Sequence, residues 1–250
     1  YCGNVVVYCG CIGTLPINKY VKNAKSGDHL VLAGGRTGRD GIHGVTFASL
    51  ELTEKSEEVS RPAVQIANPI DEEKLKRAII KVRDMELASS ITDLGGGGLS
   101  SALGESAHRY GYGAIVELER IPLKYPNIPP WEIYISESQE RMLVTVPEKN
   151  LKKVLEIFEF EEVEATDIGY LSSDQVLILS YDGKVVAELD MGFLFNPPNI
   201  QRRTEWEKPV YVEPSFVEPK KLTDVLLNLL SSSNIASKEA VIRSYDHEVK

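Results

Sequence analysis

The chain has 250 residues, a formal net charge of −9 and three cysteines, Cys2, Cys9 and Cys11. The acidic balance argues against a general nucleic-acid binder, because no basic face stands out that could neutralise a phosphate backbone. No apolar run approaches the roughly 18 residues of a membrane helix. Because the cysteines are odd in number and cluster at one end, a secreted disulfide framework is not expected, and a cytoplasmic protein is.

Short apolar runs predict strands, and amphipathic stretches predict helices, along most of the chain. Strands are expected at residues 5–12, 29–33, 91–94, 114–119, 141–146, 163–168, 176–180 and 185–189. Helices are expected at residues 71–87, 99–110, 149–159 and 222–230, with a helical turn leading to Ser136. Asp71 is expected to cap the first helix, and Asp182-Gly183 predicts a hairpin turn. These elements indicate an α+β fold, with mixed α and β layers, in which helices flank a mixed sheet.

The composition changes after this array of elements. Asn196 to Pro219 is rich in proline and charged residues and has no hydrophobic period, so it is interpreted as a linker. A mixed domain therefore precedes the linker, and the beginning of a further segment follows it. Because the chain starts in a strand-like run at Tyr1 and ends at Lys250 after a helical segment, it is expected to be part of a longer protein.

The stretch from Gly34 to Phe47 combines closely spaced glycines with the charged residues Arg36, Arg39, Asp40 and His43. Glycines gather where the backbone turns tightly or approaches another group closely. Since the stretch follows a predicted strand, it has the properties of an anion site, with side chains that can pair with phosphate, carboxylate or metal. The alternative is a surface hairpin loop with solvated charges.

A second glycine-rich stretch follows Asp93, with glycines at 95–98 before the predicted helix that starts at Leu99. Glycine amides and the helix dipole favour an oxyanion there. Asp93 is placed to hold Mg²⁺, which prefers carboxylate, water and phosphate oxygens. The stretch is neither a G-x-x-x-x-G-K-[ST] loop nor a G-x-G-x-x-G fingerprint. The alternative is a simple strand-to-helix turn with Asp93 as a cap.

Polar residues also gather at the junction between the helical turn and the strand at 141–146. Glu137, Ser138 and Gln139 can converge on one polar ligand there, although a solvated loop explains them equally well. Gln65 is a polar residue within an apolar extended run, so its amide requires either backbone or ligand partners.

Nucleophilic catalysis and zinc hydrolysis are poorly supported. The chain has no Ser-His-Asp order, no C-x-x-C and no H-E-x-x-H. Cys9-Gly10-Cys11 lacks the second ligand pair of a zinc site. His43 could act as an acid or base near neutral pH, whereas His108 is expected to be packed or capping.

Taken together, these segments resemble the phosphoribosylformylglycinamidine synthase family, the ATP-dependent amidine-forming ligases of purine synthesis. The stretches that carry the resemblance are residues 35–44, 61–65, Asp93 with its glycines, and 136–142. The family belongs to a superfamily with aminoimidazole ribonucleotide synthetase, thiamine-monophosphate kinase and selenophosphate synthetase, whose members pair an ATP-binding half with a companion αβ half.

The resemblance implies a division of the chain into four parts. Residues 1–14 would be the tail of a first ATP-binding domain, and residues 25–195 its companion domain. Residues 196–221 would be a linker, and residues 222–250 the opening of a second ATP-binding domain. The family's upstream catalytic histidines and ATP-binding lysine would then lie outside this chain, so no catalytic residue is expected on it.

The resemblance also implies ligands and partners. Substrate contacts are implied at Gln65, Glu137, Ser138 and Gln139, and a magnesium ligand at Asp93. ATP would activate the amide oxygen of formylglycinamide ribonucleotide, and ammonia from a glutaminase domain or subunit would displace phosphate. A small bridging subunit would complete the assembly, and uncovered apolar surface allows a homodimer of the chain.

Two departures from the family pattern stand out. Four consecutive glycines replace Gly-Ala-Ala-Gly after Asp93, and Ala67-Asn68-Pro69 replaces Gly-Asp-Pro, which removes one carboxylate. Two other functions stay open: a different kinase or synthetase half of the same superfamily, and a non-catalytic module that assembles a complex with a glutaminase.

Overall fold

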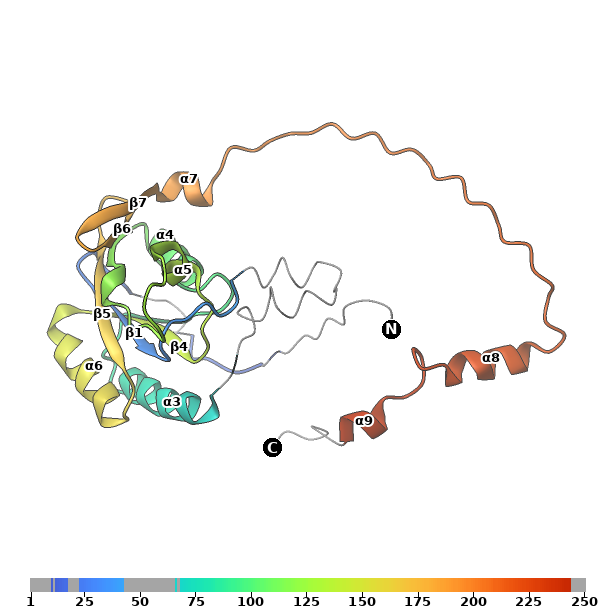
Figure 1. Ribbon diagram of the computed structural model, residues 1–250, viewed down its shortest axis with the longest axis horizontal. Helices are drawn as coiled ribbons and strands as arrows, with labels where there is room; N and C mark the ends of the chain where they lie inside the picture. Colours follow the sequence, from blue (N-terminus) through green and yellow to red (C-terminus); the bar gives the residue numbers. More distant parts are fainter. Residues whose placement is uncertain (1–9, 11, 18–22, 43–65, 67, 244–250) are drawn as a thin grey trace. The chain divides into compact units, whose positions relative to one another are not determined.

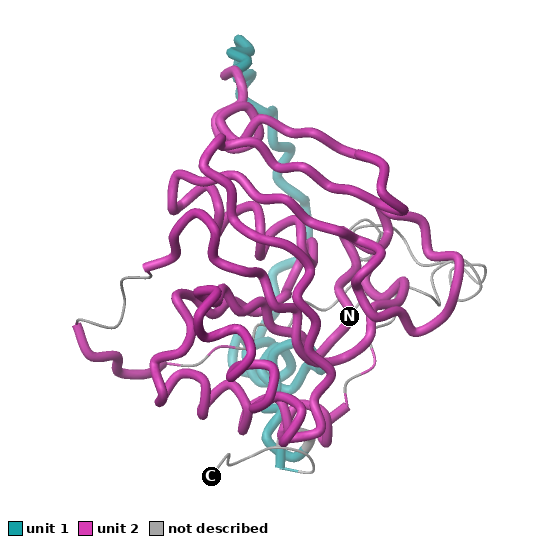
Figure 2. Tube along the Cα trace, turned by 90° about the vertical axis from the view of Figure 1, so that its left-hand side faces the viewer, with its two compact units in different colours: residues 1–7, 200–250 teal, residues 8–199 magenta. Residues whose placement is uncertain are grey.

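A mixed β-sheet organises the computed structural model, which describes residues 10, 12–17, 23–42, 66 and 68–243. The chain divides into two units, residues 8–199 and residues 1–7 with 200–250 (Figure 2). The strand expected at residues 5–12 falls largely outside the described residues.

The sheet lies in the unit formed by residues 8–199 and has the order β2-β4-β1-β5-β3-β6-β7 (Figure 1). Neighbouring strands are antiparallel except β3 and β6, which are parallel. The strands are β1 (His29–Gly34), β2 (Ser90–Asp93), β3 (Gly113–Glu117), β4 (Arg141–Val146), β5 (Ala165–Ser172), β6 (Val176–Tyr181) and β7 (Lys184–Asp190). The mixed sheet confirms the expected α+β fold.

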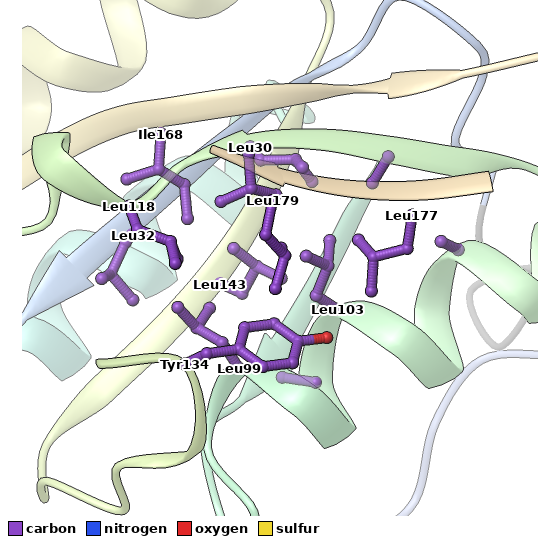
Figure 3. Packing of buried hydrophobic residues seen from close by; sticks show 14 of the residues in the cluster. Leu30, Leu32, Leu99, Leu103, Leu118, Tyr134, Leu143, Ile168, Leu177 and Leu179 are labelled. Carbon is purple, nitrogen blue, oxygen red and sulfur yellow. The ribbon is translucent and has the colours of Figure 1, made fainter. Parts of the chain in front are cut away.

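Helices cover both faces of this sheet because its central strands bury both sets of side chains. In β1, Leu30 and Leu32 join one buried cluster, and Val31 and Ala33 join another. The first cluster includes side chains from α4 (Leu99–Tyr110) and α5 (Pro130–Ile135) (Figure 3). It also includes Met191 of α7 (Met191–Phe195). The second packs against α3 (Pro69–Asp84) and α6 (Glu148–Phe160) (Figure 1). Two helical layers therefore enclose the sheet.

The start of α3 differs from the sequence prediction. Asn68, and not Asp71, caps the helix, because its side chain accepts hydrogen bonds from the N–H groups of Ile70 and Asp71. Pro69 then occupies the first helical position, where its missing N–H costs nothing. The helix ends at Asp84, three residues earlier than predicted, with Met85 as its C-cap.

Two strands also have boundaries that the periodicity did not predict. β3 stops at Glu117, and residues Leu118–Arg120 continue as the 3₁₀ helix η2, so the alternation over 114–119 overstated the strand. β5 continues past Gly169 to Ser172. Position 169 requires a glycine, because β3 passes so close that a Cβ there would collide with the carbonyl oxygen of Ile115.

The short helix α7 closes the unit against α4. Its Met191 is buried in the first cluster, and Phe195 stacks on the ring of His108 with centroids 4.5 Å apart. This contact confirms the expectation that His108 is a packed residue.

The unit that contains residues 200–250 is described by local structure only. Residues 200–219 have no regular secondary structure and are exposed, and the helices α8 (Leu222–Ser231) and α9 (Glu239–Arg243) follow. The division of the chain at residues 14, 25, 195 and 221 stays a prediction. None of the helices in the described part of the chain is long and apolar enough to cross a membrane.

Candidate functional site

Three segments that are distant in sequence meet at one end of the neighbouring strands β2, β4 and β1. We call them the glycine-arginine loop (residues 34–42), the glycine run (residues 95–98) and the serine-glutamate loop (residues 136–140). The first follows β1, the second joins β2 to α4, and the third joins α5 to β4. The pairing of β1, β2 and β4 brings them together, since Gly34 pairs with Arg141 and Asp93 with Met142.

A buried arginine holds two of these segments in place. Arg141 is 3% exposed, and its guanidinium donates to the carbonyl oxygens of Ser138 (2.8 Å) and Ser136 (2.6 Å). It also donates to the Thr37 hydroxyl at 2.8 Å, which ties the serine-glutamate loop to the glycine-arginine loop. Burial lowers the pKa of the guanidinium to about 10, so it stays protonated at neutral pH and keeps all its donors.

Ser138 lies at the centre of a second polar cluster and is fully buried. Its hydroxyl accepts a hydrogen bond from the Gly38 N–H at 2.8 Å and donates to the carboxylate of Asp40. Lys124 pairs with the same carboxylate at 2.8 Å. Burial acts to raise the pKa of Asp40, but the bonds from Lys124 and Ser138 outweigh it and lower that pKa. The Ser136 hydroxyl lies 3.1 Å from the Ser138 hydroxyl and completes its set of partners, so direct contact with a ligand would require the Ser138 hydroxyl to give up one of them.

Glycines permit the close approach of the three segments. A Cβ at Gly34 would collide with the carbonyl oxygen of Glu140, and one at Gly98 with that of Ser136. A Cβ at Gly41 would collide with the side chain of Glu137. All three glycines also have positive φ angles, so both space and backbone conformation require glycine there.

Glu137 lies between the two glycine-rich segments. Its N–H donates to the carbonyl oxygen of Asp40 at 2.8 Å. Its carboxylate accepts the N–H of Gly97 at 2.9 Å, so the protein's own anion sits at the glycine run near the start of α4. The Gln139 side chain donates to the Glu137 carbonyl oxygen at 3.0 Å. Glu137, Ser138 and Gln139 therefore share one loop but differ in exposure and in contacts.

The charged side chains of the glycine-arginine loop pair with protein groups and not with an open site. Arg36 pairs with Glu164 at 2.8 Å, and Arg39 with Glu132 at 2.6 Å. Hydrogen bonds to these carboxylates raise the pKa of both arginines further. Arg36 and Arg39 thus pair with carboxylates, one of the pairings that the sequence predicts for this stretch, and these carboxylates belong to the protein itself. His43 lies outside the described residues.

A cavity of about 310 Å³ opens beside the serine-glutamate loop. Asp93 and Gln139 line it, together with Glu140 and Lys76. Side chains of α3 and of the start of β4 form an apolar wall of the cavity, which includes Leu75, Ile79, Ile80 and Met142. The structure thus brings together two of the residues that the sequence singled out, a carboxylate and an amide. Gln65 lies outside the described residues.

Asp93 could supply one of the several oxygen ligands that a bound metal ion needs. It is exposed at the end of β2, and within the described residues no hydrogen bond or ion pair engages its carboxylate. The described residues contain no cluster of three histidine, cysteine or acidic side chains. A single free carboxylate fits Mg²⁺, which keeps several waters and takes one or two carboxylates together with phosphate oxygens.

The sequence interpretation missed Arg141, Thr37 and Lys124. A charged residue at the start of the apolar run 141–146 was the available signal for Arg141, because a charge beside a buried strand requires partners. Thr37 and Lys124 gave no comparable signal.

The chain belongs to the family described as AIR synthase related protein, C-terminal domain, which matches residues 25–182. More particularly, it is similar to PurL, a subunit of phosphoribosylformylglycinamidine synthase. It is 42% identical to the PurL subunit of Thermoplasma volcanium over 255 aligned residues, which cover 100% of this chain and 33% of that one. These findings confirm the resemblance stated from the sequence.

Solved structures give the same result. Thermotoga maritima PurL complexed with FGAR matches with a TM-score of 0.67 and 32% identity, over 91% of this chain and 35% of that one. The complex of that protein with ATP matches with a TM-score of 0.60 and 30% identity, over 83% and 32%. The structure of PurLQS from T. maritima matches with a TM-score of 0.64 and 28% identity, over 91% and 33%. The chain spans about a third of the length of the curated relatives it matches.

Proposed function

We propose that this chain supplies a substrate- and magnesium-binding part of a phosphoribosylformylglycinamidine synthase, an ATP-dependent carbon–nitrogen ligase of purine synthesis. The reaction would convert formylglycinamide ribonucleotide (FGAR), ATP and glutamine-derived ammonia to the corresponding amidine. The observation that carries the proposal is the cavity in which Asp93 and Gln139 meet, in a chain similar to a PurL that was solved with FGAR.

The proposed roles follow from the contacts. Gln139 uses its amide N–H on the Glu137 carbonyl oxygen, so its amide oxygen would be the group that accepts from the substrate's N–H or hydroxyl donors. Glu137 adds a carboxylate acceptor beside it. Gln65 would be a further substrate contact, as the family resemblance implies. For Ser138 we propose a supporting contribution, because its buried hydroxyl fastens the loop to Gly38 and Asp40.

Asp93 is the residue that we propose to hold Mg²⁺. Bound there, the ion would spread the negative charge of a transferring phosphoryl group. The exposed carboxylate at the end of β2 leaves room for water and phosphate oxygens. The apolar wall from α3 and β4 would exclude water from one side of the substrate.

The remaining proposals concern the setting of the enzyme. A solved assembly named PurLQS supports association of the whole protein with two further kinds of subunit, which we propose to be a glutaminase and a small bridging subunit. ATP would be a cosubstrate, as the complex of T. maritima PurL with ATP supports. The cytoplasm is the proposed location.

Calorimetric titration of the chain with FGAR, with and without Mg²⁺, tests the proposal. We expect saturable binding that Mg²⁺ strengthens, and loss of that strengthening in Asp93→Asn. Asp84→Asn is the matched control, because Asp84 is an exposed aspartate at the far end of α3 from the cavity. Absence of binding up to millimolar FGAR would overturn the proposal for this chain, and an Mg²⁺ effect that survives in Asp93→Asn would overturn the role of Asp93.

A further inference from the structure

The serine-glutamate loop has an unusual internal hydrogen-bond pattern. Its carbonyl oxygens at Ser136, Glu137 and Ser138 each accept a hydrogen bond from a side chain of the loop itself or of Arg141, the first residue of β4. Arg141 takes the first and the third of them, and Gln139 takes the middle one. Since buried carbonyl groups require partners, this pattern fixes the course of the backbone on both sides of Glu137.

Fixing this course also fixes where Glu137 and Gln139 point. With its two flanking carbonyls directed at the guanidinium, Glu137 extends between Gly41, which has no Cβ to obstruct it, and the Gly97 N–H. Gln139 folds back on Glu137 and lines the cavity. The two side chains proposed to meet the substrate thus depend on one buried cation.

The geometry of this cation favours a positioning role over an ion pair. Within the described residues, Arg141 makes no salt bridge, and its three acceptors are neutral: two carbonyl oxygens and the Thr37 hydroxyl. Asp40 is the charged group that offsets its burial electrostatically. A guanidinium presents its donors in a rigid planar fork, whereas a lysine ammonium is a single point that cannot span the same acceptors.

We propose that Arg141 is a positioning residue, and that it sets the directions of Glu137 and Gln139 by holding both carbonyls around Glu137 and anchoring them to Thr37. That Glu137 and Gln139 contact the substrate is part of the proposed function, and this part of the inference rests on it. The hydrogen bond to Thr37 is the part of this device that can be removed with the least disturbance. Thr37 is fully buried. Because valine has nearly the same shape as threonine, Thr37→Val replaces the hydroxyl with a methyl group and changes little else.

The experiment compares Thr37→Val and Arg141→Lys with two controls. Thr37→Ser keeps the hydroxyl acceptor. Thr145→Val makes the same substitution at a threonine that is 2% exposed and lies four residues further along β4. Each variant is measured for FGAR affinity at a temperature where it is folded, for its thermal unfolding midpoint, and for amide hydrogen exchange at Gly97 and Glu137. Thr37→Val carries the test where Arg141→Lys does not fold.

We expect Thr37→Val to bind FGAR about tenfold more weakly, which is the scale of one hydrogen bond to a charged group. Amide exchange at Gly97 and Glu137 should accelerate by a similar factor, and Thr37→Ser should restore both. Thr145→Val should lower the unfolding midpoint without changing either. A merely structural role predicts that Thr37→Val behaves as Thr145→Val does, and that result would overturn the proposal.

The exchange measurement separates this proposal from the proposed function. Should the unmodified chain not bind FGAR, the proposed function fails, while exchange at Gly97 and Glu137 still decides the positioning role. Faster exchange in Thr37→Val would support that role, and unchanged exchange would overturn it.

Discussion

The glycine-arginine loop and the glycine run have similar compositions but different surroundings. In the first, Arg36, Arg39 and Asp40 all pair with groups of the protein itself. In the second, the glycines at 95 and 96 are exposed, and the adjacent Asp93 carboxylate is not engaged by any described residue. The first loop is therefore held by its charged side chains to other segments of the protein, whereas in the second Gly95, Gly96 and Asp93 stay exposed, and Gly97 donates its N–H to Glu137. Glycine content alone does not distinguish these two uses, but the partners of the neighbouring charges do.

The largest expected effect is a difference in stability between alanine substitutions at two positions of the glycine run, Gly98 and Gly96. Gly98→Ala places a Cβ against the Ser136 carbonyl oxygen at a φ of 56°, so we expect a destabilisation of about 3 kcal/mol or more. In Gly96→Ala the nearest atom to the new Cβ is a Glu137 carboxylate oxygen at 4.0 Å, so this control should be within about 0.5 kcal/mol of the wild type. Urea unfolding measures both. Equal losses would contradict the distinction between a closed and an open end of the run.

A smaller effect contrasts the two carboxylates. Asp40→Asn should cost about 1–3 kcal/mol at pH 7, because it removes a charge that accepts from Lys124 and Ser138. Asp93→Asn should leave stability unchanged within about 0.5 kcal/mol. Chemical unfolding at pH 7 measures both variants.

The pH dependence provides a second test of the same pair. The pKa of Asp40 is lowered in the folded state, so its stabilisation is complete above its ordinary value of 3.8 and is lost as the pH falls through the folded value. The stability difference between wild type and Asp40→Asn should therefore shrink in acid. A difference that stays constant down to low pH would contradict the assigned charge pairing.

The smallest effect concerns the exposed pair of the glycine-arginine loop. Arg36 and Glu164 have side chains that are 60% and 41% exposed, so water and salt screen their attraction. Arg36→Gln should change the unfolding midpoint only slightly, and 1 M NaCl should remove the remaining difference. A large, salt-insensitive loss would show that this arginine fastens the loop more firmly than its exposure indicates.

Sequence periodicity predicted some elements fully and others in part. α4 and β4 have the predicted bounds, because an amphipathic stripe before Gly111 and an unbroken apolar run leave little ambiguity. The cap of α3 was assigned to Asp71, because the pattern favours the acid inside the first turn over the asparagine before the proline. The predicted range of β5 stops before Gly169, whereas the strand continues to Ser172, because the close approach of β3 requires a glycine within β5.

The site could be predicted in its parts but not in its connections. The resemblance picked out Asp93 and Gln139, and the structure places both at one cavity. The hydrogen bond between Arg141 and Thr37 joins residues 104 positions apart. A single sequence has no local pattern that reports a contact of this kind. The exposed or buried state of Glu137 and Ser138 likewise depends on the packing of three segments.

The long sequence separation within the site has a consequence for how the chain folds. Gly38 and Ser138 are 100 residues apart, and Asp40 and Ser138 are 98 apart. Closing loops of that length costs entropy that is recovered only when β1 and β4 have paired. The site therefore cannot form as an early, independent nucleus, and it should be acquired in the last cooperative step together with the central sheet. A refolding chain would then gain the FGAR affinity that we propose at the same rate as its native tertiary signal, with no earlier binding-competent intermediate.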